Sequence, residues 1–263
     1  MPTITILTFE EMPTLEEAIS LLNGKKKGED WVSARQNKYN QDEIFIQYWY
    51  YENIESGLKR ALSEEDSYEI VSVLKENGMD RVLKRVYAFV NYLTHTLEIY
   101  IGNDAKARKL LSILEENLKI KFTSLRLTEA ELLEIYKKHS NELTKVVLRD
   151  SLSKEEIAIS GGNVDNSEVF GQLFGDSGLG VRAIAFHPRI KFMNQNNRYI
   201  VSLDGDRGTL RISSNQIFQW RPRYEIRQIV FIIAATKRML ERKEAAFHEI
   251  EEPQRSSPNE VVA

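Results

Sequence analysis

The feature that most constrains this sequence is a pair of apolar, aromatic-rich segments, residues 86–93 and 96–101, separated by only two residues. So short a connection joins antiparallel strands, because parallel strands need a crossover of a dozen or more residues. Residues 198–203 and 208–213 have the same pattern, with the turn-forming residues 204–207 between them. The chain is therefore expected to fold around antiparallel hairpins.

Helical segments lie between these hairpins. Capping boxes, in which a Ser or Thr is followed three residues later by an acidic residue, mark helix starts at Thr14, Ser63 and Thr128. The apolar spacing after Thr128 continues to Val147, and an uninterrupted pattern predicts a last helix of about 25 residues from Tyr224. Hairpins mixed with helices favour an α+β fold with a predominantly antiparallel, curved sheet and flanking helices, rather than a doubly wound parallel sheet.

Composition indicates a globular chain without a membrane span or thiol chemistry. The 263 residues are 42% hydrophobic and 29% charged, which suffices for a buried core. The longest apolar run, residues 229–235, is far shorter than the roughly 20 residues that cross a bilayer. Residues 1–9 lack the features of a signal peptide, and the absence of cysteine excludes disulfides and thiolate metal sites. A cytoplasmic location is expected, and no cofactor or metal site is predicted.

Charge is distributed unevenly along the chain. The net charge is −3, yet residues 178–243 hold 13 basic and 4 acidic side chains, a balance of +9. We expect an acidic α+β half in residues 1–150, a basic sheet-plus-helix half in residues 151–250 and a disordered tail in residues 251–263, with one sheet continuous through both halves. A helix, a glycine and then strands follow in the same order in each half, which suggests a pseudo-twofold repeat.

The basic half contains a predicted face of cations. Because alternate residues of a strand point to opposite faces, the cations between the apolar positions of its strands share one outward face. Two further arginines bracket the start of the last helix, where backbone N–H groups favour anions. The predicted nucleic-acid-binding residues are Arg189, Lys191, Arg198, Arg211, Arg221 and Arg223. Arginine suits phosphate groups better than lysine does, so this surface suggests a polyanionic partner.

Three other patterns carry less weight. Residues 204–206 resemble a cation-binding loop but lack further ligands at the required spacing, so a hairpin turn explains them. The glycines in residues 175–180 follow a helix and precede a strand, which is the reverse of a phosphate-binding loop. The aromatic run at residues 48–51 is expected to bury two rings and to leave the other two exposed or at an interface.

Three functions stay open at this point. The basic face favours a non-enzymatic protein that binds nucleic acid, with double-stranded DNA as the favoured form. Charge complementarity serves protein interfaces equally well, so one alternative is an interaction or assembly subunit whose basic face contacts an acidic partner or the chain's own acidic half. Another is a metal-dependent nuclease, because carboxylates far apart in sequence can assemble a two-metal site. No catalytic signature is present, and the sequence does not determine the oligomeric state.

The order of the elements also resembles that of a known family. The segments that carry the resemblance are residues 32–35 and 43–49, the hairpin 86–101, the leucine-rich helix 105–118, residues 119–127, the helix 128–142 and the hairpin 198–213. This order is similar to the sheet domain shared by centromere proteins N and L of the inner kinetochore, although the family's N-terminal helical domain has no counterpart before Trp31. The resemblance implies a curved antiparallel sheet that binds DNA or a protein partner rather than performing chemistry.

Overall fold

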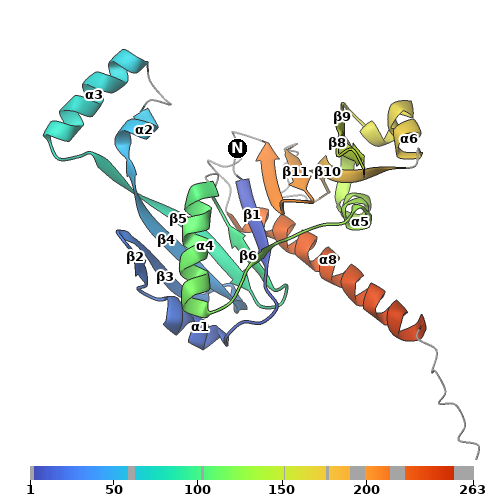
Figure 1. Ribbon diagram of the computed structural model, residues 1–263, viewed down its shortest axis with the longest axis horizontal. Coiled ribbons are helices and arrows are strands. Elements are labelled where there is room, and N and C mark those ends of the chain that lie inside the picture. Colours follow the sequence, from blue (N-terminus) through green and yellow to red (C-terminus); the bar gives the residue numbers. More distant parts are fainter. Residues whose placement is uncertain are drawn as a thin grey trace, which may run out of the picture.

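The computed structural model describes residues 3–58, 63–101, 104–150, 152–175, 178–189, 199–213 and 223–251 (Figure 1). The strands are β1 (Thr3–Thr8), β2 (Lys26–Lys27), β3 (Asp30–Asn37), β4 (Asn40–Asn53), β5 (Arg81–Asn91), β6 (Thr96–Ile99), β7 (Thr123–Ser124), β8 (Ser140–Asp150), β9 (Glu156–Ser160), β10 (Leu179–Pro188), β11 (Ile200–Asp204) and β12 (Thr209–Ser213). The helices are α1 (Leu15–Leu22), α2 (Ile54–Leu58), α3 (Glu64–Glu76), α4 (Asp104–Leu118), α5 (Glu129–His139), the 3₁₀ helix η1 (Val164–Asn166), α6 (Glu168–Gly175) and α8 (Arg223–Glu251).

All the described strands belong to one open antiparallel sheet. Their order is β2-β3-β4-β5-β6-β1-β12-β11-β10-β8-β9, and β7 pairs with β1. The predicted α+β fold with a predominantly antiparallel sheet and flanking helices is therefore confirmed. The strand order does not show the suggested pseudo-twofold repeat.

Local sequence signals set several helix starts as predicted. Thr14 and Thr128 cap α1 and α5 with both hydrogen bonds of a capping box. The Ser63 hydroxyl accepts a hydrogen bond from the Asp66 N–H at the start of α3, and α8 begins one residue before its predicted start at Tyr224. These interactions satisfy N–H groups that a helix leaves without partners, so a few neighbouring residues determine them.

The prediction that the helix after Thr128 continues to Val147 is wrong. α5 ends at His139, and β8 follows directly. The three-residue step between the buried Leu143 and Val146 resembles helical spacing, but it coincides with a register shift between β8 and β10. An irregularity of this kind inserts an extra residue into a strand and disturbs its two-residue period.

Two hydrophobic cores lie on opposite faces of the sheet. In the first core, α1 and α4 pack on β3 to β6 through residues such as Leu22, Leu110 and Ile46. In the second core, α5 and α8 pack on β8, β10, β11 and β12 through residues such as Leu132 and Ile233. Figure 1 shows α4 lying across the strands of the first half, whereas α8 extends away from the sheet at an angle.

The covered face of the sheet changes at β1. Ile4 and Ile6 belong to the second core, whereas Leu7 belongs to the first. Ile6 lies opposite Glu98, and Leu7 lies opposite Leu97, so each pair points to one face of the sheet. We call the face of Leu7 and Leu97 the α4 face, and the face of Ile6 and Glu98 the α8 face. Helices of the first core cover the α4 face of β3 to β6, and helices of the second cover the α8 face of β8 to β12.

The two cores divide the chain near residue 123. The first core draws on residues 7–122, and the second draws on residues 125–233 together with Ile4 and Ile6. α5 and β8 therefore pack with the second half, although both precede residue 150, where the predicted acidic half ends. None of the described helices is both long and apolar enough to span a membrane.

Candidate functional site

A group of aromatic and arginine side chains lies on the α8 face of β3, β4 and β5. Alternation along β4 sends Tyr48 and Tyr50 into the first core and turns Trp49 and Tyr51 to the opposite face, which confirms the predicted division of the aromatic run. We call the resulting surface the aromatic face. Its members are Trp31, Ser33 and Arg35 of β3, Phe45, Gln47, Trp49 and Tyr51 of β4, and Arg85, Tyr87 and Phe89 of β5.

Cross-strand register aligns most of the aromatic face in three rows. The rows are Trp31–Trp49–Arg85, Ser33–Gln47–Tyr87 and Arg35–Phe45–Phe89. The third row continues through Glu98 to Ile6, which places the whole surface on the α8 face. Trp31, Phe45 and Trp49 are partly exposed and belong to neither hydrophobic core.

Stacking contacts begin in the first row. The rings of Trp31 and Trp49 stack at 5.8 Å between centroids, with 10° between their planes. The guanidinium of Arg85 lies 4.9 Å from the Trp49 ring centre and 4.7 Å from that of Tyr87, so it links the first and second rows. Each such contact is worth about 0.5–1 kcal/mol at an exposed site.

The same stack continues to the third row. The rings of Tyr87 and Phe45 stack at 5.5 Å with 22° between their planes, and the Arg35 guanidinium lies 5.2 Å from the Phe45 ring centre. Two arginines and four rings thus form an unbroken series of contacts across three strands. The arrangement fixes flat, polarisable groups at a solvent-accessible surface, where planar ligands can stack.

The aromatic face is cationic. It carries Arg35 and Arg85 and no carboxylate, and neither arginine forms an ion pair within the described residues. The side-chain carbonyl of Gln47 accepts a 3.4 Å hydrogen bond from the Ser33 hydroxyl. The Gln47 amide nitrogen has no hydrogen-bond partner among the described residues, so it offers a donor between two stacking rows.

Arg227 of α8 closes one end of the aromatic face. Its guanidinium lies 3.6 Å from the Phe89 ring centre, pairs with the carboxylate of Glu43 and lies 3.3 Å from that of Glu98. The Tyr100 hydroxyl donates a 2.7 Å hydrogen bond to Glu98. Burial raises the pKa of Glu98, while the charge of Arg227 acts in the opposite direction. This buried network attaches the last helix to strands of the first half.

Several cations of the basic half have structural roles. Arg227 pairs with Glu43 and Glu98, and Lys237 pairs with Glu131 at 3.0 Å, so both contact the acidic half. Burial by itself would lower the pKa of Lys237. Its carboxylate partners, Glu131 and Glu241, outweigh this effect, so the pKa of Lys237 is raised. These two cations are therefore bound to carboxylates of residues 1–150, and neither belongs to the predicted cationic face.

The structure describes only part of the predicted cationic face. Arg211 is exposed on the α4 face of β12, opposite Ser202 of β11. Arg189 follows β10, its side chain donates to the Ser140 carbonyl oxygen, and it lies about four residues, roughly 13 Å, beyond the row of Arg211 along the strand. The remaining predicted residues, or their side chains, lie outside the described part of the chain: Lys191, Arg198, Arg221 and Arg223.

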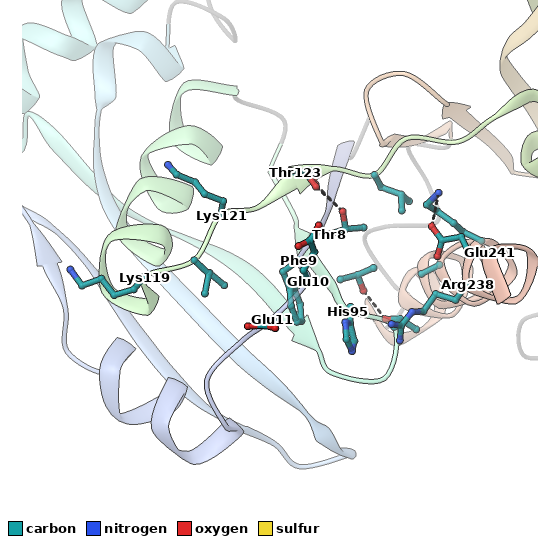
Figure 2. A pocket seen from close by; sticks show the side chains of 16 residues that line it. Thr8, Phe9, Glu10, Glu11, His95, Lys119, Lys121, Thr123, Arg238 and Glu241 are labelled. Atoms are coloured by element: carbon teal, nitrogen blue, oxygen red, sulfur yellow. Dashed lines mark hydrogen bonds and ion pairs between the residues drawn. The ribbon is translucent and has the colours of Figure 1, made fainter. Parts of the chain in front are cut away.

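A cavity of about 660 Å³ lies where β1 ends, beside α8 and the turn before β6 (Figure 2). Its lining mixes cations such as Lys121 and Arg238 with acids such as Glu10 and Glu11. The His95 ring stacks on Phe9 in this wall, at 5.3 Å between centroids. Burial lowers the pKa of His95, and the nearby Arg238 lowers it further. The mixed charges give this cavity no preference for one charged ligand.

Comparison with known proteins adds no family. No protein-family model matches the chain, and no curated protein matches it as a relative. The resemblance to centromere proteins N and L therefore stays a prediction. Within the described residues, no three acidic, histidine or cysteine side chains gather as a set of metal ligands. The nuclease alternative stays a prediction.

Proposed function

We propose that this chain is a non-enzymatic nucleic-acid-binding protein and that its aromatic face binds single-stranded nucleic acid. The observation that carries the proposal is the series of contacts Trp31–Trp49–Arg85–Tyr87–Phe45–Arg35 on an accessible sheet surface. Unpaired bases stack on aromatic rings and guanidinium planes, and arginine also contacts phosphate oxygens. The free amide donor of Gln47 can meet a base edge between the stacking rows.

The chemistry of this face favours a single strand over a duplex. In a duplex the flat surfaces of the bases are stacked on each other, so exposed rings gain nothing from it. Duplex binding depends instead on cations that contact backbone phosphates. Arg211 would serve that mode, and it lies on the α4 face of β12, opposite to the face that carries the aromatic residues. The two modes therefore require different residues.

A protein partner is the second candidate for the same surface. Trp, Tyr and Arg are the residue types that dominate the centres of protein interfaces. Tyr51 and Leu83, at the border of the aromatic face, are 40% and 41% exposed, which would suit an apolar contact. An acidic partner protein would then use Arg35 and Arg85 as its complementary charges.

The test is fluorescence anisotropy with labelled 12-nucleotide DNA and RNA single strands and the matching 12-base-pair duplex. Trp49→Ala is expected to weaken single-strand binding by about 1–3 kcal/mol, the value of one base–aromatic stack. Trp49→Phe keeps a ring and should retain most of the affinity. Tyr39→Ala removes an aromatic side chain that is 96% exposed outside this face, and it should leave binding unchanged.

Charge reversals separate the two surfaces. Arg85→Glu should abolish single-strand binding, whereas Arg211→Glu should not alter it. The proposal would be overturned if the wild-type protein preferred the duplex, and if Arg211→Glu lost duplex binding while Trp49→Ala kept it. That result would favour the basic face. Absence of binding to all three probes at low salt would also overturn it and favour the protein partner. Circular dichroism melts of each variant establish that it is folded.

A further inference from the structure

We infer that a bound single strand continues from the aromatic face onto one exposed stripe of α8, so that the helix forms a second subsite for the same ligand. This inference rests on the proposed function and extends it. The stripe, which we call the α8 stripe, consists of Phe231, Ala235, Arg238, Met239, Arg242 and Lys243. The argument depends on continuity, exposure and charge.

Continuity comes from two contacts between α8 and β5 or its following turn. Arg227 lies over the ring of Phe89, which is a member of the aromatic face. In the turn that follows β5, the Leu93 carbonyl oxygen accepts a hydrogen bond from the Arg238 guanidinium. α8 therefore runs beside the end of the aromatic face, from the level of Phe89 to that of Leu93.

The stripe points away from the core. Residues 231, 235, 238 and 242 are spaced by four, three and four positions and so lie along one side of the helix. Val230 and Ile233 on the opposite side are buried in the second core. Phe231 is 46% exposed and Leu93 is 56% exposed, so both present apolar surface beside the aromatic face. An exposed ring at this point can stack one more base.

A hollow and a set of cations coincide along the stripe. A cavity of about 460 Å³ is lined by Leu93, Phe231 and Met239 as apolar groups, with Arg238, Arg242 and Lys243 around them. Among the described residues, Arg242 forms no ion pair, whereas Lys243 lies close enough to Glu134 of α5 to help lower the pKa of that carboxyl.

The nearest acid of known position along α8 does not neutralise the stripe. Glu241 lines the cavity beside β1 together with Arg238, but its carboxylate is bound to Lys237 at 3.0 Å. On α5, the carboxylate of Glu134 is bound to Lys138 at 2.7 Å. An apolar floor with an excess of cations at its rim fits bases on the floor and phosphates at the rim.

The length of the stripe makes the inference measurable. From residue 231 to residue 242 the helix rises roughly 16 Å, which provides room for several additional nucleotides. A short strand should thus occupy the aromatic face alone, and a longer one should contact both surfaces. Affinity should rise with length until the stripe is filled, because each added contact is intramolecular once the first is made.

The experiment measures the affinity of oligothymidylates of 4, 8 and 12 nucleotides for the full chain. The triple variant Arg238→Glu/Arg242→Glu/Lys243→Glu is compared with Lys145→Glu/Arg207→Glu/Arg211→Glu, which reverses three exposed cations elsewhere and changes net charge equally. For the stripe variant, we expect 4-nucleotide binding within twofold of wild type and loss of at least tenfold at 12 nucleotides. Its log–log salt slope at 12 nucleotides should fall by roughly 2, for three lost phosphate contacts. The control variant should keep both the length dependence and the slope.

The outcomes separate the inference from the function on which it rests. If the 4-nucleotide probe binds and Trp49→Ala removes that binding, the aromatic face is supported. If the gain with length then persists in the stripe variant, or both triple variants lose it equally, the inference is overturned and the aromatic face stands. If Trp49→Ala changes nothing or no probe binds, both proposals fail.

Discussion

The guanidinium of Arg227 pairs with the carboxylate of Glu43 although the two residues lie 184 positions apart in the sequence. Glu43 is fully buried on β4, and its other hydrogen bonds come from the side chains of Asn37 and Asn91. The pair connects the last helix to the edge of the aromatic face. It therefore couples the stability of the fold to the shape of the candidate site.

Replacing Arg227 should destabilise the protein strongly. Arg227→Met leaves Glu43 and Glu98 buried without a counter-charge, and we expect the free energy of unfolding to fall by about 3–5 kcal/mol. Urea denaturation followed by circular dichroism measures this. Arg242→Met, on an exposed position of the same helix, should change it by no more than about 0.5 kcal/mol. Equal effects of the two variants would contradict a structural role for the buried pair.

The turn before β12 should not tolerate a side chain. Gly208 has φ +56°, and a Cβ there would lie 2.6 Å from the Leu125 carbonyl oxygen and 2.7 Å from that of Ile6. Gly208→Ala is expected to cost more than about 3 kcal/mol, since backbone must move as well as adopt a strained φ. Gly24 has φ +72° with no atom near its Cβ position, so Gly24→Ala should cost about 1 kcal/mol. Thermal melts of the two variants measure this difference in lost stability. Equal losses would show that the positive φ alone, and not the close backbone contacts of Gly208, determines the cost.

A buried hydroxyl on β4 should contribute measurably to stability. Tyr48 is fully buried, and its hydroxyl donates to Asp30, which also pairs with Lys109 at 2.7 Å. Tyr48→Phe removes one donor to a charged group and should lower the free energy of unfolding by about 1.5–3 kcal/mol. Tyr39→Phe removes an exposed hydroxyl and should have no effect. A change in Tyr48→Phe no larger than in Tyr39→Phe, by urea denaturation, would contradict this assignment.

The stability of the protein should decline in mild acid partly because of His95. Burial, and then the charge of Arg238, lower the pKa of His95 below its ordinary 6.5. The unfolded chain therefore binds this proton more readily, so the contribution is present above pH 6.5 and is lost as pH falls through the folded-state pKa. His95→Asn, which suits the positive φ of 49°, should reduce the loss of stability between pH 7.5 and 5. The pKa of His139 is also lowered by burial, so part of the loss should remain. Parallel curves for the two proteins, in urea denaturation at several pH values, would refute the role of His95.

Features set by neighbouring residues could be predicted from the sequence. The capping box at Thr14, the hairpin turn after Asp204 and the division of the aromatic run at Tyr48 each depend on a few adjacent side chains. The helix predicted through Val147 failed for the complementary reason. A pairing irregularity with β10, distant in sequence, decided the conformation of β8 and overrode its local spacing.

The aromatic face depended on information that spacing along the chain does not contain. Alternation showed that Trp49 would leave the core, but not that Trp31 and Arg85 lie on either side of it. Those neighbours follow from the register between strands, which pairs Trp49 with residues 18 and 36 positions away in the sequence. The charge distribution led to the prediction of Arg211 rather than of Arg35 and Arg85, because a count of cations does not register aromatic rings beside a cation. Arg35 and Arg85 lie in the acidic half, where net charge gave no signal.

The central position of β1 has a consequence for assembly of the fold. β1 pairs with β6 on one side and with β12 on the other, and it supplies side chains to both cores. Its second edge pairs with β7 at Leu7 and Thr8 and with β12 at Thr3 to Thr5, so during synthesis this second part must wait for some 200 further residues before β12 emerges. The other buried residues of the core that contains Ile4 and Ile6 all lie at residue 125 or beyond. The pairing of β1 with β12, at the middle of the sheet, can therefore form only after most of the chain has been made. Such a pairing between residues far apart in sequence is slow to form.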